Sequence, residues 1–115
     1  MTPLIMTVHF FRTAAGTEPV RDVLRALPTE DRKAVGTDIK TVQFGWPLGM
    51  PLVRKLEHGL WESRSHIRDG IVRVLFTVTG CRMVLLHGFI KKSLRAPREI
   101  ETARSRLRQL QRGKR

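Results

Sequence analysis

Cations and histidines gather in the second half of the chain, and their types suit chemistry on a phosphodiester. Cleavage of RNA by its own 2′-hydroxyl needs a base for that hydroxyl, cations around the phosphorane and an acid for the leaving oxygen. Arginine suits the second task because its planar guanidinium grips a phosphate through two parallel hydrogen bonds. The candidate residues are Arg54, Lys55, His58, Arg64, His66, Arg68, Arg73, His87, Lys91 and Lys92.

Four of these residues are candidates for the reaction itself, and each has a structural alternative. Arg73 either contacts an RNA phosphate or pairs with a carboxylate of the sheet, and the only sheet carboxylates expected are Glu57 and Glu62. His87 is either an acid–base catalyst or a hydrogen-bonded core histidine. Lys91 and Lys92 either hold the RNA backbone or mark the solvated exit of a strand.

Other kinds of active site are poorly supported by the sequence. The four histidines and the single cysteine, Cys81, form no HExxH or CxxC spacing, so a metal centre is not expected. No glycine-rich phosphate loop follows a strand. Ser63 and Ser65 do not lie in a nucleophile elbow. We therefore expect neither a metal nor a cofactor.

The charge of the chain points to a polyanionic or acidic partner. Its 115 residues carry a formal net charge of +12. Residues 91–115 hold ten Lys and Arg against two acids, a balance of +8, although a basic end of this kind is sometimes only solubilising. Such a field attracts nucleic acid, a ribosome or an acidic protein.

Length and residue usage predict one domain, residues 1–115, in the cytoplasm. A lone cysteine fits a reducing compartment. No apolar run approaches the roughly 20 residues of a membrane span, and the first residues lack the basic region of a signal peptide. We expect no membrane association.

A predicted β-hairpin at residues 71–92 must position the candidate cations. Two apolar, β-branched runs flank Thr79-Gly80-Cys81, a typical hairpin signal. A three-residue loop would place Arg73 opposite His87, whereas a two-residue loop would place it opposite Gly88. Alternation predicts one face of Val72, Val74, Phe76 and Val78 with Arg73 opposite, and one face of Met83, Leu85, His87, Phe89 and Lys91.

The remaining elements predict a small α+β domain of order β-α-α-β-β-β-α. Residues 4–12 read as a strand, and a helix follows from Pro19, with Val20, Val23, Leu24 and Leu27 in one stripe. Thr29 is placed to cap a second helix that ends near Phe44. Residues 52–56 and 60–66 read as strands, and a last helix starts at Pro97 with the stripe Ile100, Ala103, Leu107 and Leu110. The expected architecture is an antiparallel or mixed sheet with a helical hairpin on one face.

Three blocks of sequence resemble the RelE/ParE toxin superfamily, and in particular its HigB-like, phage-derived branch. They are RKLEHGLWESR at residues 54–64, VRVLF at 72–76 and LLHGFIKK at 85–92, followed by Pro97, Glu99-Ile100 and Ala103. The resemblance covers residues 52–103. It implies a RelE-like fold with a C-terminal helix, and a toxin of a type II toxin–antitoxin system that cleaves translated mRNA in the ribosomal A site without a cofactor. It also implies neutralisation by a HigA-like helix-turn-helix antitoxin.

The resemblance also implies roles for individual residues. Arg73 is similar to the arginine that holds the scissile phosphate, and Lys91 and Lys92 match the basic residues after the last strand. Together with His87 these form the expected catalytic set. The expected RNA-binding set is Arg54, Lys55, Arg64, His66 and Arg68.

Some positions depart from the family pattern and keep other functions open. Val72 stands where an aromatic residue is usual, and no tyrosine occurs, so His87 or His66 would have to act as the base. One alternative is a ParE-like toxin that inhibits gyrase. Another is a catalytically inactive relative that binds nucleic acid or antitoxin.

Overall fold

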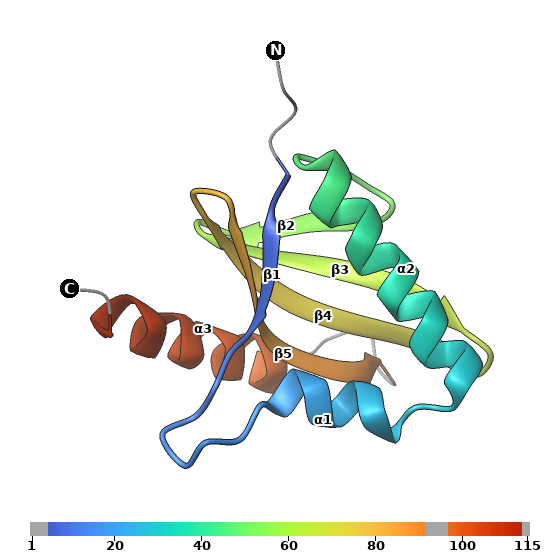
Figure 1. The fold of residues 1–115 in the computed structure, drawn as a ribbon, viewed down its shortest axis with the longest axis horizontal. Coiled ribbons are helices and arrows are strands. Elements are labelled where there is room, and N and C mark those ends of the chain that lie inside the picture. The colour runs from blue at the N-terminus through green and yellow to red at the C-terminus, as the bar shows by residue number, and fades with distance from the viewer. Residues whose placement is uncertain (1–4, 92–96, 114–115) are drawn as a thin grey trace.

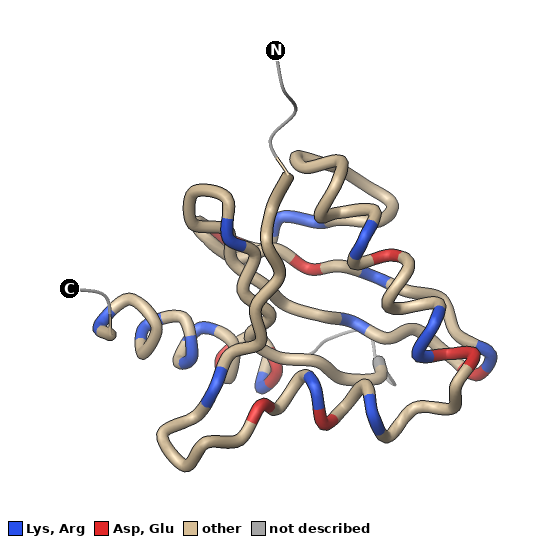
Figure 2. Tube along the Cα trace, in the orientation of Figure 1, with Lys and Arg blue, Asp and Glu red and all other residues tan. Residues whose placement is uncertain are grey.

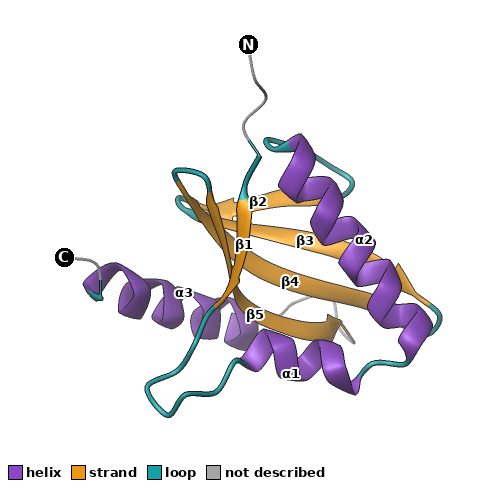
Figure 3. Ribbon diagram, in the orientation of Figure 1, coloured by secondary structure: helices purple, strands orange, loops and turns teal. Residues whose placement is uncertain are grey.

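The computed structural model describes residues 5–91 and 97–113 and has the predicted element order (Figures 1 and 3). Its five strands lie in the order β1-β5-β4-β3-β2, with β1 parallel to β5 and the other pairs antiparallel. The fold is therefore the expected α+β arrangement around a mixed sheet. The elements are β1 (Thr7–Phe10), α1 (Pro19–Ala26), α2 (Thr29–Gly45), β2 (Val53–Glu57), β3 (Leu60–Ile67), β4 (Gly70–Thr79), β5 (Arg82–Lys91) and α3 (Pro97–Arg112).

The helical hairpin α1–α2 covers one face of the sheet, as the apolar stripes predict. Pro19 occupies the start of α1, where its missing N–H costs no helix hydrogen bond. The buried core on this side combines helix residues with alternate residues of β4, which confirms the face predicted for them: Val20, Leu27, Val35, Ile39, Val42, Val72, Val74 and Phe76. The expected Thr29 cap is wrong, because Thr29 is already helical and Pro28 holds the capping position.

The C-terminal helix α3 packs on the opposite face of the sheet, which we call the α3 face. Its predicted stripe forms a second core, in which Ala103 and Leu107 are buried and Ile100 and Leu110 are half-buried. They pack against Phe11, which directly follows β1, and against four residues of the sheet: Leu60, Leu75, Val84 and Leu86. The stripe therefore serves packing within the chain.

The register of the β4–β5 hairpin differs from both predictions because β5 contains a bulge. Thr79 pairs with Arg82, so the loop is Gly80-Cys81, and Gly80 has the positive φ that such a turn favours. The ladder then shifts at Leu86, so that Leu75 pairs with His87. As a result, Arg73 lies opposite Phe89, and neither His87 nor Gly88 faces it.

The same bulge divides the predicted common face of β5 into two. Met83 and Leu85 point into the α1–α2 core. After the extra residue, His87 and Phe89 lie on the α3 face instead, together with Arg73. The bulge thus delivers His87 to the face that carries the candidate cations.

The other strands follow the prediction closely at their ends. The expected strands at 52–56 and 60–66 become β2 and β3, joined at His58-Gly59, with a bulge in β2 between Lys55 and Glu57. The first strand is shorter than predicted, and residue 4 lies outside the described residues. In the described residues, no helix is long and apolar enough to cross a membrane.

Candidate active site

The part of the α3 face toward the β3–β4 turn brings several predicted cations together. Arg64 on β3, Arg73 on β4 and Phe89 on β5 lie in one cross-strand row. The neighbouring row runs from Arg54 through Glu62 and Leu75 to His87. Figure 2 shows how Lys and Arg are spread over the strands and α3. Arg54 and Arg73, which are 19 positions apart in the sequence, thus lie in adjacent rows of one surface.

Arg73 is held by a buried carboxylate at the centre of this face. Its Nη1 donates a hydrogen bond of 3.2 Å to Oε2 of Glu62. Only 8% of the Arg73 side chain and 2% of the Glu62 side chain are exposed. A buried charge of this kind is tolerated because its partner compensates it. The structure therefore contains the ion pair that the sequence left open as an alternative.

The Glu62 carboxylate lies between two arginines. Arg64 is directly across the strands from Arg73, and like charges in that position repel each other. Arg64 Nε lies 4.0 Å from Glu62 Oε1, and a quarter of the Arg64 side chain is exposed. Glu62 Oε1, Arg64 Nε and Arg73 Nε are buried without a hydrogen-bond partner among the described residues. The cluster keeps a net positive charge and retains unused donors.

His87 is bound through both ring nitrogens by residues of α3. Its Nε2 lies 3.1 Å from Oε1 of Glu99, and its Nδ1 lies 3.0 Å from Nη1 of Arg106. Because arginine only donates, Nδ1 must be the acceptor, and Nε2–H must donate to the carboxylate. His87 is therefore neutral in this arrangement, and its basic nitrogen is occupied.

Arg106 and Phe89 complete the surroundings of this histidine. Arg106 Nη1 also donates to the carbonyl oxygen of Leu86, the bulge residue, at 2.9 Å. Burial lowers the pKa of the Arg106 guanidinium from its ordinary value. The ring of Phe89 stacks on His87 with centroids 5.6 Å apart. The imidazole is thus fixed in position and tautomer.

The other predicted RNA-binding residues are dispersed. Lys55 lies on the opposite face, with Nζ 5.9 Å from the ring centre of Trp61. His66 is exposed on β3 opposite Ile71, and Arg68 lies in the β3–β4 turn, where its backbone N–H donates to Asp31. Lys91 ends β5, but its side chain, like all of Lys92, lies outside the described part of the chain.

Sequence reasoning missed Glu99 and Arg106. They are seven residues apart on α3, so they lie on the same side of the helix, and this spacing was the available signal. Their distance from His87 along the chain hid the contact. In residues 5–91 and 97–113, no group of three or more His, Cys, Asp or Glu is arranged to hold a metal ion.

A third ionic group, which is partly exposed, links α3 to the edge of the sheet. Arg104 donates through Nε and Nη2 to both oxygens of Glu57, each at 2.8 Å. Arg104 also bonds Glu101, which in turn accepts from Arg108. These hydrogen bonds lower the pKa of Glu57 and of Glu101 and raise the pKa of Arg104. The α3 face therefore has its own ionic frame around the site.

Comparison with known proteins adds one finding to this geometry. The family model described as Phage derived protein Gp49-like (DUF891) matches residues 22–108, which is well over half of the chain. The matched segment includes the residues of the site on β3, β4, β5 and α3. A search of curated proteins finds none that matches.

Proposed function

We propose that this chain, which belongs to the phage-derived Gp49-like family of RelE-like toxins, is a HigB-like toxin that cleaves mRNA on the ribosome. Its family is consistent with a toxin of a toxin–antitoxin system in general. The observation that carries the finer proposal is the pair Arg64 and Arg73, which face each other across β3 and β4 around one carboxylate. Because only 8% of the Arg73 side chain is exposed, against a quarter of the Arg64 side chain, a phosphate would meet Arg64 first and would reach Arg73 only after neighbouring side chains turn aside.

In the proposed reaction, the 2′-hydroxyl oxygen attacks the adjacent phosphorus and the 5′-oxygen leaves, which yields a 2′,3′-cyclic phosphate. Arg73 donates to the phosphorane oxygens, and Glu62 holds it in position. A donor that is fixed before the reaction costs no reorganisation in the transition state. Arg64 supplies the second cation, with a partly exposed side chain that can turn toward the RNA.

Proton transfer in this scheme falls to His87. In the free protein the imidazole is neutral, and its Nδ1 accepts from Arg106. Once bound RNA has drawn Arg106 away, Nδ1 takes the 2′-hydroxyl proton, and the resulting imidazolium gives its Nε2 proton to the leaving 5′-oxygen. Lys91, the last residue of β5, and Lys92, the next residue in the sequence, would hold the RNA backbone. The exposed residues Arg54, Lys55, His66 and Arg68 would contact flanking RNA or the ribosome.

The proposed partners follow from the same assignment. The toxin would act in the cytoplasm, on mRNA in the ribosomal A site, and a HigA-like helix-turn-helix antitoxin would neutralise it. The net charge of +12 supports attraction to both ribosomal RNA and an acidic antitoxin.

Sequencing of RNA 5′ ends after induction tests the proposal. Wild-type protein is expected to produce new ends within translated messages, and Arg73→Lys is expected to remove most of them, because an ammonium cannot replace the planar fork. Arg25→Lys, on the exposed side of α1, is the matched control and should cleave like wild type. Intact mRNA during growth arrest by wild-type protein would contradict the nuclease.

The burial of Arg73 and the occupied nitrogens of His87 favour a second candidate, a toxin without catalysis. A ParE-like gyrase inhibitor would cause DNA breaks and a DNA-damage response while translation continues. An inactive relative would bind nucleic acid in a salt-sensitive manner without growth arrest. The same induction experiment, combined with a DNA-damage reporter, separates these outcomes from mRNA cleavage.

A further inference from the structure

The two edge strands of the sheet differ in their protection against pairing with another chain. The edge strand β2 carries Arg54 and Lys55 and contains a bulge, which are common devices that block strand addition. The edge strand β1, Thr7–Phe10, has no Lys, Arg or Pro and no bulge. Of the two, β1 is the edge that remains suited to accept a strand.

Backbone hydrogen bonds show which groups of β1 are open. The N–H groups of Thr7 and Phe11 donate to Cys81 and Leu85, so these alternate residues face β5. Met6 faces the other way, and its N–H and carbonyl are bonded by Gln43 of α2, at 3.3 and 2.8 Å. Val8 and Phe10 face the same outer side as Met6, and no described residue bonds their backbone groups there. The outer edge is thus free directly beyond the contact with α2.

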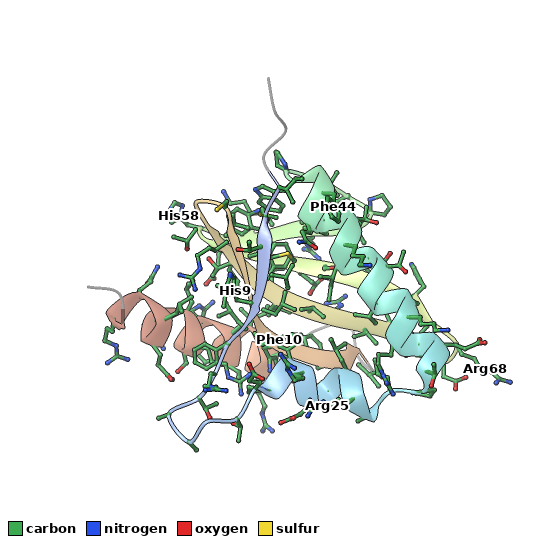
Figure 4. All side chains as sticks on the ribbon, viewed as in Figure 1. His9, Phe10, Arg25, Phe44, His58 and Arg68 are labelled. Atoms are coloured by element: carbon green, nitrogen blue, oxygen red, sulfur yellow. The ribbon has the colours of Figure 1, made fainter. Side chains whose placement is uncertain are left out.

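A hollow of about 530 Å³ adjoins this edge, between β1 and the end of α3. Its apolar residues include Phe11, Val84 and Leu110, and its cations are Arg12 and Arg82, with no acid among the residues that line it. Figure 4 shows His9 and Phe10 along β1. Arg82 and Val84 precede Phe89 on β5 by seven and five residues, which is roughly 23 and 17 Å of strand, so the hollow lies toward the other end of β5 from the Arg73 row.

We propose that the β1 edge and this hollow bind an extended, acidic peptide segment of a partner protein. The segment adds as a strand to β1, exchanges backbone hydrogen bonds with Val8 and Phe10, and places an apolar side chain in the hollow. Its acids face Arg12 and Arg82. In strand addition, the backbone hydrogen bonds provide the affinity, and the pockets for side chains provide the specificity. If the chain is a toxin as proposed above, the natural source of the segment is the antitoxin. The binding site itself does not depend on the proposed function.

A peptide fits these features better than RNA does. Unpaired backbone N–H and C=O groups along a strand match the repeat of another polypeptide backbone. The hollow also offers apolar side chains beside its cations, which suits a segment that alternates acidic and apolar residues. RNA binding at the hollow would therefore overturn the proposal.

The test uses the purified full chain and a short labelled peptide that alternates Asp or Glu with Val or Leu, followed by fluorescence polarisation. The matched control peptide has the same sequence with alternate backbone amides N-methylated, so that its charge is unchanged but strand pairing is blocked. We expect the parent peptide to bind and the methylated peptide to bind at least about tenfold more weakly. Equal binding of the two would reduce the interaction to charge attraction and overturn the proposal.

Variants of the protein locate the site. Arg82→Glu should weaken the parent peptide by at least about tenfold, because like charges then face each other, whereas Arg25→Glu on α1 should leave binding unchanged. Val8→Pro removes an outward N–H without removing a hydrogen bond to β5, and should weaken binding if its melting temperature shows a folded protein. Unchanged peptide binding by Arg82→Glu would overturn the assignment.

Two further arms separate this inference from its competitors. A single-stranded RNA oligonucleotide that displaces the peptide, and whose own binding is lost in Arg82→Glu, would assign the hollow to RNA instead. Peptide binding is measured without ribosomes, and mRNA cleavage is measured without peptide. Loss of one result therefore leaves the other standing.

Discussion

Glu62 and Arg73 form an ion pair inside the α3 face, whereas Glu57 and Arg104 form one at its rim. The first pair is 2% and 8% exposed, and the second is 34% and 42% exposed. The rim pair has the better geometry, with two bonds of 2.8 Å against one of 3.2 Å. Burial nevertheless makes the inner pair the more consequential one, because removal of Glu62 leaves the Arg73 guanidinium without water or a counter-ion.

The difference bears on function as well as stability. An exposed pair can exchange its partners with water at little cost, so it fixes α3 only loosely. A buried pair keeps Arg73 in one orientation whether or not RNA is present. The inner pair is therefore a structural element, and in the proposed function its Arg73 would also be a positioned phosphate ligand. Variants of the two pairs separate these roles.

The largest effect is expected for Glu62→Ala. It leaves the Arg73 guanidinium buried and unpaired, which should lower the free energy of unfolding by about 3–5 kcal/mol. Urea denaturation followed by circular dichroism measures it. The double variant Glu62→Leu/Arg73→Met should recover most of the loss, because it removes both charges and keeps the volume. A loss below that of Arg104→Ala would contradict the importance of burial.

His87→Ala should have the next largest effect on stability. It deprives Glu99 and Arg106 of their shared partner, and a loss of about 1–3 kcal/mol is expected from the unsatisfied groups. Cleavage by the purified protein on ribosomes is the second readout, where loss of an acid–base catalyst would reduce the rate by about 10²–10⁴. His66→Ala, which removes an exposed histidine of β3, is the control. A stable His87→Ala protein that cleaves normally would exclude both roles.

Arg104→Ala should have a small effect, because its ion pairs are exposed. Exposed pairs contribute about 0.2–1 kcal/mol, and salt screens them further. The difference in unfolding free energy from wild type is expected to shrink in high salt, whereas that of Glu62→Ala should not. Equal salt sensitivity of the two variants would remove the distinction between rim and interior.

The smallest effect is a pH dependence of the rim pair. The hydrogen bond from Arg104 lowers the pKa of Glu57 below its ordinary 4.5. A carboxyl group with a lowered pKa in the folded state stabilises the protein above its ordinary pKa, and this contribution is lost as the pH falls through the lowered value. Wild type and Arg104→Ala should therefore converge in stability in acid. A difference that persisted there would point to packing of the Arg104 stem.

Much of the fold was predictable because it depends on local periodicity. Alternation along residues 71–78 assigned Arg73 to the face opposite Val72, Val74 and Phe76, and the structure confirms it. The spacing of Ile100, Ala103, Leu107 and Leu110 likewise gave the packed side of α3. The two prolines at helix starts, Pro19 and Pro97, marked where these helices begin.

The site was less predictable because its contacts join distant segments. The sequence offered Arg73 either a phosphate or a sheet carboxylate, and only the β3–β4 register brought Glu62 to it. Glu99 and Arg106 reach His87 from a helix that follows in the chain, so no local pattern named them. The predicted Thr29 cap failed for a smaller reason, since the helix starts one residue earlier than a cap would require.

The sequence by itself determined the apolar side of most helices and strands and the positions of Lys and Arg along the chain. The tertiary structure alone decided the faces of β5, because Val84-Leu85-Leu86 is apolar throughout and gives no alternation to follow. Two cores compete for this segment: Leu85 fills the one under α1 and α2, and Val84 and Leu86 fill the one under α3. The bulge satisfies both cores, and it thereby turns His87 toward Glu99 and Arg106.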